Sequence, residues 1–104
     1  MKRVKRRYIA LLLECDSLPS EREFLDAVWA AVTKLYGEVG ASLTGLSLIN
    51  FDGKRKIFVI RTSLSSLSMV KTSLATVTTV AGKAAALNVL AVSGTLKALY
   101  DNVG

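Results

Sequence analysis

Two clusters of basic side chains are the groups in this sequence best suited to bind a charged partner. Their members are Lys2, Arg3, Lys5, Arg6 and Arg7 near the N-terminus, and Lys54, Arg55 and Lys56 beside an Asp-Gly pair. Such groups neutralise nucleic-acid phosphates and release counterions, so their affinity falls steeply with salt and carries no base-sequence information. We predict that both clusters bind RNA or DNA, the alternatives being a solvated tail and an ordinary solvated turn.

Groups that could carry catalysis are scarce. The chain has no histidine, one cysteine (Cys15) and eight carboxylates, so histidine-based acid or base catalysis and the usual zinc, copper and haem ligand sets are excluded. Ser93 has no partner base, and Cys15 has no histidine to activate it. We expect no catalytic site in the chain and no metal or cofactor bound by it.

Length, charge and hydropathy restrict the class of protein further. The 104 residues suffice for one domain, and 51% of them are apolar, yet no apolar run approaches the roughly 18 residues of a membrane-spanning helix. The net charge is +6, and five of the fourteen basic residues lie in the first seven positions. These features predict a soluble protein without membrane contact, and the lone cysteine fits a reducing cytoplasm.

The first half of the chain should form a strand, a helix and a hairpin. Residues 8–14 are almost continuously apolar, which is typical of a strand covered on both faces. Ser20 and Glu23 have capping-box spacing, and apolar residues then recur every three or four positions, so a helix is expected over residues 21–36 with Gly37 as its stop. Strands over residues 46–51 and 54–61 should flank the turn.

The second half should add a helix, a strand and a short final helix. Apolar residues repeat at helical spacing over residues 64–77, although serine, threonine and valine weaken this helix. A strand over residues 86–92 follows, and Ser93-Gly94-Thr95 is best explained as the N-cap of a helix that reaches Tyr100, with a phosphate-binding turn as the alternative.

This order of elements, β-α-β-β-α-β-α, predicts the fold class. It is α+β, with a ferredoxin-like or RNA-recognition-like sandwich of an antiparallel four-stranded sheet, two helices and a short C-terminal helix. Residues 1–7 should form a basic arm, and residues 8–104 a single domain. Phe58 should lie in the core rather than stack on bases, because its strand lacks the paired aromatics of the RNA-recognition signature.

Both faces of the predicted sheet are apolar. Odd- and even-numbered positions of a strand point to opposite faces of the sheet. Within the strand over residues 8–14, and again within the strand over residues 54–61, both sets of positions carry apolar side chains. Two helices cover one face of such a sheet. The short C-terminal helix should cover part of the second face, and a protein partner or self-association should cover more.

Four short motifs, taken in order, resemble ribonuclease P protein component 2, a small subunit shared by archaeal and eukaryotic ribonuclease P. The motifs are Arg6-Arg7-Tyr8-Ile9, Tyr36-Gly37-Glu38-Val39-Gly40, Ile60-Arg61-Thr62 and Val92-Ser93-Gly94-Thr95-Leu96-Lys97. The resemblance implies a tRNA-processing ribonucleoprotein in which a catalytic RNA removes the 5′ leader of precursor tRNA with Mg²⁺. It further implies pairing with a larger barrel-shaped subunit, protein component 3, in a dimer of heterodimers.

Two other functions fit the same topology. A ferredoxin-like regulatory module that binds a small ligand explains the apolar sheet but leaves the basic arm unexplained. An acylphosphatase-type enzyme needs a phosphate-binding loop with arginine after the first strand, but Glu14-Cys15-Asp16-Ser17 stands there instead. The ribonuclease P subunit is therefore the preferred prediction, with the regulatory module as the alternative.

Overall fold

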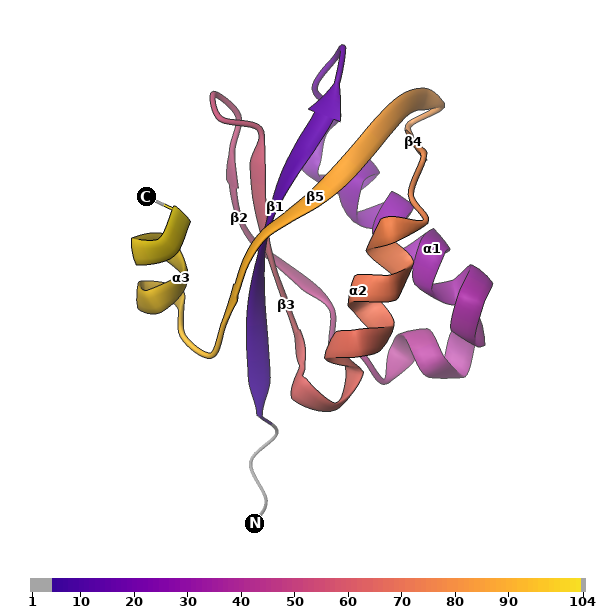
Figure 1. Ribbon diagram of the computed structural model, residues 1–104. Coiled ribbons are helices and arrows are strands. Elements are labelled where there is room, and N and C mark those ends of the chain that lie inside the picture. Colours follow the sequence, from indigo (N-terminus) through magenta and orange to yellow (C-terminus); the bar gives the residue numbers. More distant parts are fainter. Residues whose placement is uncertain (1–4, 104) are drawn as a thin grey trace.

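The computed structural model describes residues 5–103 and contains one curled antiparallel sheet with helices on both faces (Figure 1). The elements in chain order are β1 (Arg6–Cys15), α1 (Glu21–Ser42), β2 (Ser47–Asp52), β3 (Ile57–Ser63), the 3₁₀ helix η1 (Leu64–Ser66), α2 (Leu67–Ala75), β4 (Thr79–Val80), β5 (Lys83–Ser93) and α3 (Leu96–Val103). The strand order is β2-β3-β1-β5-β4, so β1 lies at the centre. The predicted fold class is confirmed.

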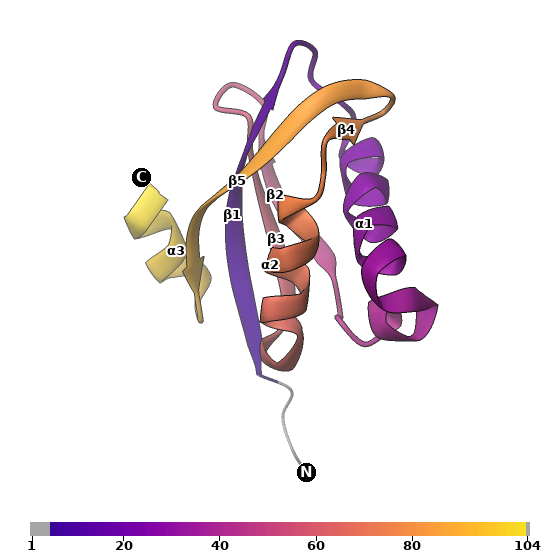
Figure 2. The same cartoon turned by 45° about the vertical axis from the view of Figure 1, so that its right-hand side comes forward.

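The molecule has three layers. Helices α1 and α2 lie side by side on one face of the sheet, and α3 lies on the opposite face (Figure 2). We call the face that carries α3 the outer face. Within the described residues, no helix is both long and apolar enough to cross a membrane.

Helix α1 begins with the predicted capping box and bends at the predicted glycine. The Ser20 hydroxyl accepts a 3.1 Å hydrogen bond from the Glu23 N–H, and the Glu23 carboxylate accepts a 2.9 Å bond from the Ser20 N–H. Gly37 has φ 77° and ψ 173°, a conformation open essentially to glycine alone. The prediction that the helix ends at Tyr36 was wrong, because the chain resumes helical structure beyond Gly37 and continues to Ser42.

The main core lies between the sheet and helices α1 and α2. Phe58 of β3 is fully buried there between two other rings, with its centroid 3.8 Å from that of Phe24 and 4.3 Å from that of Phe51. Ile9, Leu11 and the rest of this face of β1 pack around the stack. Phe58 is therefore a core residue, as predicted from the missing aromatic pair.

A second, smaller core lies beneath α3 on the outer face. Leu99 is fully buried against Ala10, Ile57 and Val59. Tyr8, Leu12, Ile49, Ala91, Leu96 and Val103 pack at its margin. The expectation that the C-terminal helix covers part of the second apolar face is confirmed.

Several boundaries differ from those predicted. Strand β1 begins at Arg6, so Arg6 and Arg7 pair with β3 and do not belong to a separate arm. The sheet has a fifth strand, because Thr79 and Val80 turn back at Gly82 and pair with the start of β5. A strand of two residues is too short to show alternation, so the sequence carried no sign of it.

Candidate nucleic-acid interface

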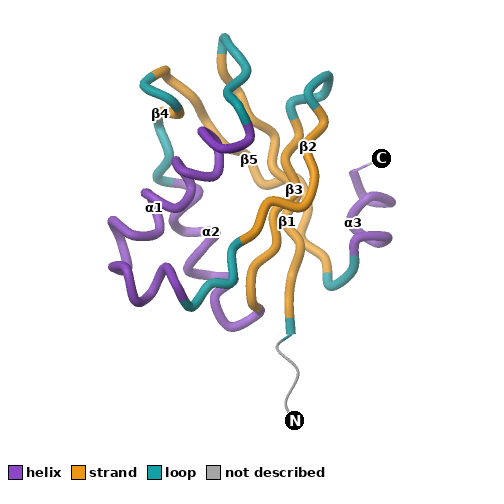
Figure 3. Tube along the Cα trace, turned by 180° about the vertical axis from the view of Figure 1, so that it is seen from behind, coloured by secondary structure: helices purple, strands orange, loops and turns teal. Residues whose placement is uncertain are grey.

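The two basic clusters predicted from the sequence lie at opposite ends of the sheet. Arg6 pairs with Ser63 at one end of β1, whereas Leu12 pairs with Ile57, the first residue of β3, near the other end. Six residues of strand separate the two positions, which is about 20 Å. Figure 3 shows the β2–β3 turn at the end of the molecule away from the N-terminus. The clusters therefore form two separate surfaces, and Lys2 and Arg3 lie outside the described residues.

The turn between β2 and β3 holds its three basic residues in different ways. The Asp52 carboxylate accepts hydrogen bonds from the backbone N–H groups of Lys54 and Arg55 at 3.1 and 3.2 Å. The Lys56 ammonium donates a 3.0 Å bond to the carbonyl oxygen of Cys15. The Arg55 guanidinium donates a 2.9 Å bond to the carbonyl oxygen of Val103. Arg55 and Lys56 thus make internal contacts that sequence reasoning did not foresee.

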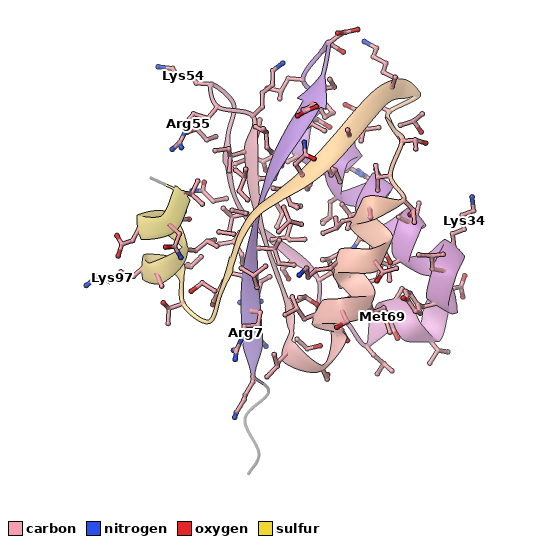
Figure 4. All side chains as sticks on the ribbon, in the orientation of Figure 1. Arg7, Lys34, Lys54, Arg55, Met69 and Lys97 are labelled. Carbon is pink, nitrogen blue, oxygen red and sulfur yellow. The ribbon has the colours of Figure 1, made fainter. Side chains whose placement is uncertain are left out.

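Lys54 is the basic residue of this turn that points away from the protein (Figure 4). Its side chain is exposed, and among the described residues it makes neither an ion pair nor a side-chain hydrogen bond. A lysine in this position can meet a phosphate without first breaking an internal contact. Lys54 is therefore the strongest phosphate-binding candidate at this end of the sheet.

The other end of the sheet carries the basic residues at the start of β1. Lys5 and Arg6 are exposed. Arg7 is half-buried, and its guanidinium donates a 2.9 Å hydrogen bond to the carbonyl oxygen of Arg6 and lies beside Gly94. The strand fixes the backbone of Arg6 and Arg7, so these charges are presented in a set position rather than on a loose arm.

Ser93, Gly94 and Thr95 join β5 to α3 next to Arg7. The Thr95 hydroxyl accepts a 3.2 Å hydrogen bond from the N–H of Ala98, and the Ser93 hydroxyl accepts a 3.3 Å bond from the N–H of Thr95. The predicted N-cap is confirmed, and Thr95 is the capping residue.

Arg61 is a basic residue of this region that was not among the predicted binding residues. It lies on β3 directly opposite Tyr8 of β1, and both side chains are half-buried on the outer face. The buried Nε of Arg61 has no hydrogen-bond partner. The alternation of β3 could have revealed it, since Ile57, Val59 and Arg61 occupy one face of the strand.

A groove of about 600 Å³ lies on the other side of the molecule, between α1 and residues 76–81. Its lining is mainly alanine and threonine, with Glu23, Asp26 and Lys34 among the charged residues. This mixture of charges does not favour a polyanion, so the groove does not extend the basic surfaces.

The fold and the basic ends together define a class: a small ferredoxin-like protein with basic residues at both ends of its sheet. The model of the Rpp14/Pop5 family matches residues 7–103, and the chain belongs to this family. The family predicted from the sequence is thereby confirmed.

Named relatives agree with this assignment. The chain is 34% identical over 97 residues to ribonuclease P protein component 2 of Pyrococcus furiosus, covering 93% of this chain and 81% of the relative. It is 33% identical over 95 residues to the protein of that name from Methanosarcina mazei, covering 91% and 80%. The findings support the predicted ribonuclease P protein subunit.

A solved structure shows the same fold. A chain in the cryo-EM structure of yeast ribonuclease MRP is similar to this protein with a TM-score of 0.73 and 15% sequence identity, covering 92% of this chain and 79% of the yeast chain. At this identity the likeness concerns the fold.

Proposed function

We propose that this protein is a ribonuclease P subunit that binds the catalytic RNA at two sites, one at each end of its sheet. The observation that carries the proposal is the separation of the basic residues, with Lys5, Arg6 and Arg7 at one end and Lys54 at the other. Family membership and the names of the relatives support an RNA–protein assembly.

The two basic ends act by neutralising RNA phosphates. A spacing of about 20 Å is longer than the screening distance of about 8 Å at physiological ionic strength, so the two ends act on different stretches of RNA. Holding two stretches together reduces their mutual repulsion and lowers the Mg²⁺ concentration that the RNA needs to fold and to cleave precursor tRNA. The Mg²⁺ ions belong to the RNA, and the protein contributes charge and position.

A protein partner completes the assembly, and protein component 3 is the one we propose. Exposed apolar side chains near the C-terminal end of α1 support a protein contact: Val39 is exposed to 77% and Leu43, which caps the helix, to 68%. Large apolar side chains that are this exposed favour a protein interface. The pair then forms a dimer of heterodimers.

The experiment that tests the function is cleavage of precursor tRNA by the cognate catalytic RNA across a range of Mg²⁺ concentrations. This protein and component 3 are added separately and together. We expect the pair to lower the Mg²⁺ requirement more than either protein does alone. If both proteins fold and bind each other but leave cleavage unchanged, the proposal fails and the small-ligand regulatory module becomes the better hypothesis.

A further inference from the structure

The outer face of the sheet is covered by α3 over part of its area. The anchor of α3, Leu99, packs on Ala10, Ile57 and Val59. The next residues on the same face, toward the N-terminal end of β1, are Tyr8 on β1 and Arg61 on β3. They are half-buried and lie next to the area covered by α3.

Tyr8 and Arg61 are direct neighbours across two paired strands. Tyr8 pairs with Arg61 on one side and with Ser93 of β5 on the other. Side chains directly opposite each other in antiparallel strands share a face, and their Cβ atoms lie about 4.5–5.5 Å apart. An aromatic ring, a guanidinium and a hydroxyl therefore form one row across the three central strands of the sheet.

The guanidinium of Arg61 lacks the acceptors that a half-buried arginine normally has. It has five N–H donors, its buried Nε has no partner, and no hydrogen bond from its side chain reaches any residue among 5–103. A buried donor without an acceptor is costly, and native proteins satisfy nearly all such groups. The buried Nε is out of reach of an external group, but the terminal N–H donors of the half-buried guanidinium have no acceptor within residues 5–103 and are free to meet an anion.

The charge around Arg61 indicates which kind of acceptor fits. The strand segments 6–9, 60–63 and 91–93 surround the row, and they contain three arginines and no aspartate or glutamate. Arg6 lies on the same face as Tyr8, two residues earlier on the strand. This surrounding favours an anionic group, and the adjacent ring favours an anion that is attached to a flat aromatic system.

We propose that Tyr8 and Arg61 form a seat for one unpaired RNA nucleotide, with the base packed on the Tyr8 ring and its phosphate held by the Arg61 guanidinium. The inference rests on the proposed function and specifies where single-stranded RNA meets the protein. An aromatic ring can stack on any of the four bases, and an arginine–phosphate contact does not depend on which base is present. The seat therefore selects unpaired RNA without selecting its sequence.

The test uses an eight-nucleotide oligouridine and the full chain, with the dissociation constant measured across KCl concentrations. Tyr8→Leu removes the ring, so affinity should fall about tenfold while the salt dependence stays unchanged. Arg61→Gln removes one phosphate contact, so affinity should fall and the slope of log affinity against log salt should decrease by about 0.7.

Conservative variants separate binding from folding. Tyr8→Phe keeps the ring and should bind within about twofold of the wild type. Arg61→Lys keeps the charge but loses the planar fork of donors, so it should restore the salt slope and only part of the affinity. Lys71→Gln is the matched control, because Lys71 is exposed on α2, on the opposite face of the sheet. Thermal unfolding checks that each variant is folded.

Three results would contradict the proposal that Tyr8 and Arg61 form a seat for a nucleotide. They are a wild-type protein that does not bind the oligouridine, a folded Tyr8→Leu variant that binds like the wild type, and Arg61 variants that weaken only the association with component 3. The last result would assign Arg61 to a protein carboxylate. If the wild type together with component 3 still lowers the Mg²⁺ requirement of the catalytic RNA, the proposed function stands without the seat. If it does not, the function itself has failed.

Discussion

The guanidinium of Arg55 donates a 2.9 Å hydrogen bond to the carbonyl oxygen of Val103, and so joins the β2–β3 turn to the last turn of α3. A cation at the C-terminal end of a helix also interacts favourably with the helix dipole. Nearby, the amide of Asn50 donates a 3.2 Å bond to the Tyr100 hydroxyl. The turn predicted to bind RNA therefore also holds the helix that covers the outer face.

Replacing Arg55 with alanine should loosen α3. Because Arg55 is exposed, the lost bond and dipole interaction should cost about 0.5–1 kcal/mol in the free energy of unfolding. Hydrogen exchange should accelerate in residues 96–103 and stay unchanged in α1. Lys54→Ala, one position away, is the control and should leave exchange in α3 as it is. Equal exchange in both variants would show that the Arg55 contact does not hold α3.

Truncating Leu99 should have a much larger effect. Its side chain is fully buried and anchors the second core, so Leu99→Ala should lower the free energy of unfolding by about 2–5 kcal/mol in urea denaturation. Lys97→Ala changes an exposed residue of the same helix and should stay within about 0.5 kcal/mol of the wild type. A similar small loss for Leu99→Ala would mean that α3 contributes little to stability.

Gly37 should resist substitution for a backbone reason alone. Its φ of 77° and ψ of 173° are strained for any other residue, whereas a Cβ built there meets no atom within 4 Å. We therefore expect Gly37→Ala to cost about 1–3 kcal/mol in thermal or urea unfolding. Glu38→Ala, at an exposed neighbouring position, is the control. An unchanged stability for Gly37→Ala would show that α1 can straighten at this point.

The capping box at the start of α1 should make stability depend on pH. The pKa of Glu23 is lowered from its ordinary value of 4.5, chiefly by the hydrogen bond from the Ser20 backbone N–H and next by the Ser20 side chain. A lowered folded-state pKa stabilises the protein above the ordinary value, and this stabilisation is lost as the pH falls through the folded-state pKa. Glu23→Gln should therefore be less stable than the wild type at pH 7, and the difference should shrink below pH 4.5. A difference independent of pH would contradict this assignment.

The distance between the basic ends predicts independent contributions to RNA binding. Lys54→Ala and Arg6→Ala should each lower the affinity for the catalytic RNA and reduce its salt dependence. In the double variant the two losses, expressed as free energies, should add, because sites this far apart rarely couple. Lys34→Ala removes an exposed charge from α1 and serves as the control. Strong non-additivity would indicate that one end binds only after the other.

The sequence predicted features that depend on local chemistry. The Ser20–Glu23 capping box and the N-cap before α3 follow from neighbouring residues, and the structure contains both. The predicted stop at Gly37 is present as an interruption of the helix, beyond which helical structure resumes. Features that depend on contacts between distant residues were missed. The Arg55–Val103 bond joins positions 48 residues apart, and the Lys56–Cys15 bond joins positions 41 apart, so no local pattern indicates them.

The candidate site was predicted in composition but not in arrangement. Charge counts identified the basic residues, yet whether Arg6 and Lys54 lie together depends on the direction of β1 relative to β3, which composition does not encode. The alternation of β3 places Arg61 on the same face as Ile57 and Val59, but the pairing of Arg61 with Tyr8 depends on the neighbouring strand and could not be predicted from the sequence. The burial of the Arg61 Nε atom can be recognised only in the folded structure, in which the strands are paired.

The central position of β1 has a consequence for how the protein is made. Strand β1 is translated before its two neighbours, β3 and β5, and its pairing with β5 joins residues as far apart as 8 and 93. Pairings between such distant residues form slowly because a long loop must close first. Until β5 has been synthesised, the nascent chain exposes an apolar strand with an unpaired edge, a known starting point for aggregation. Early contact with a chaperone or an assembly partner would protect that edge during translation.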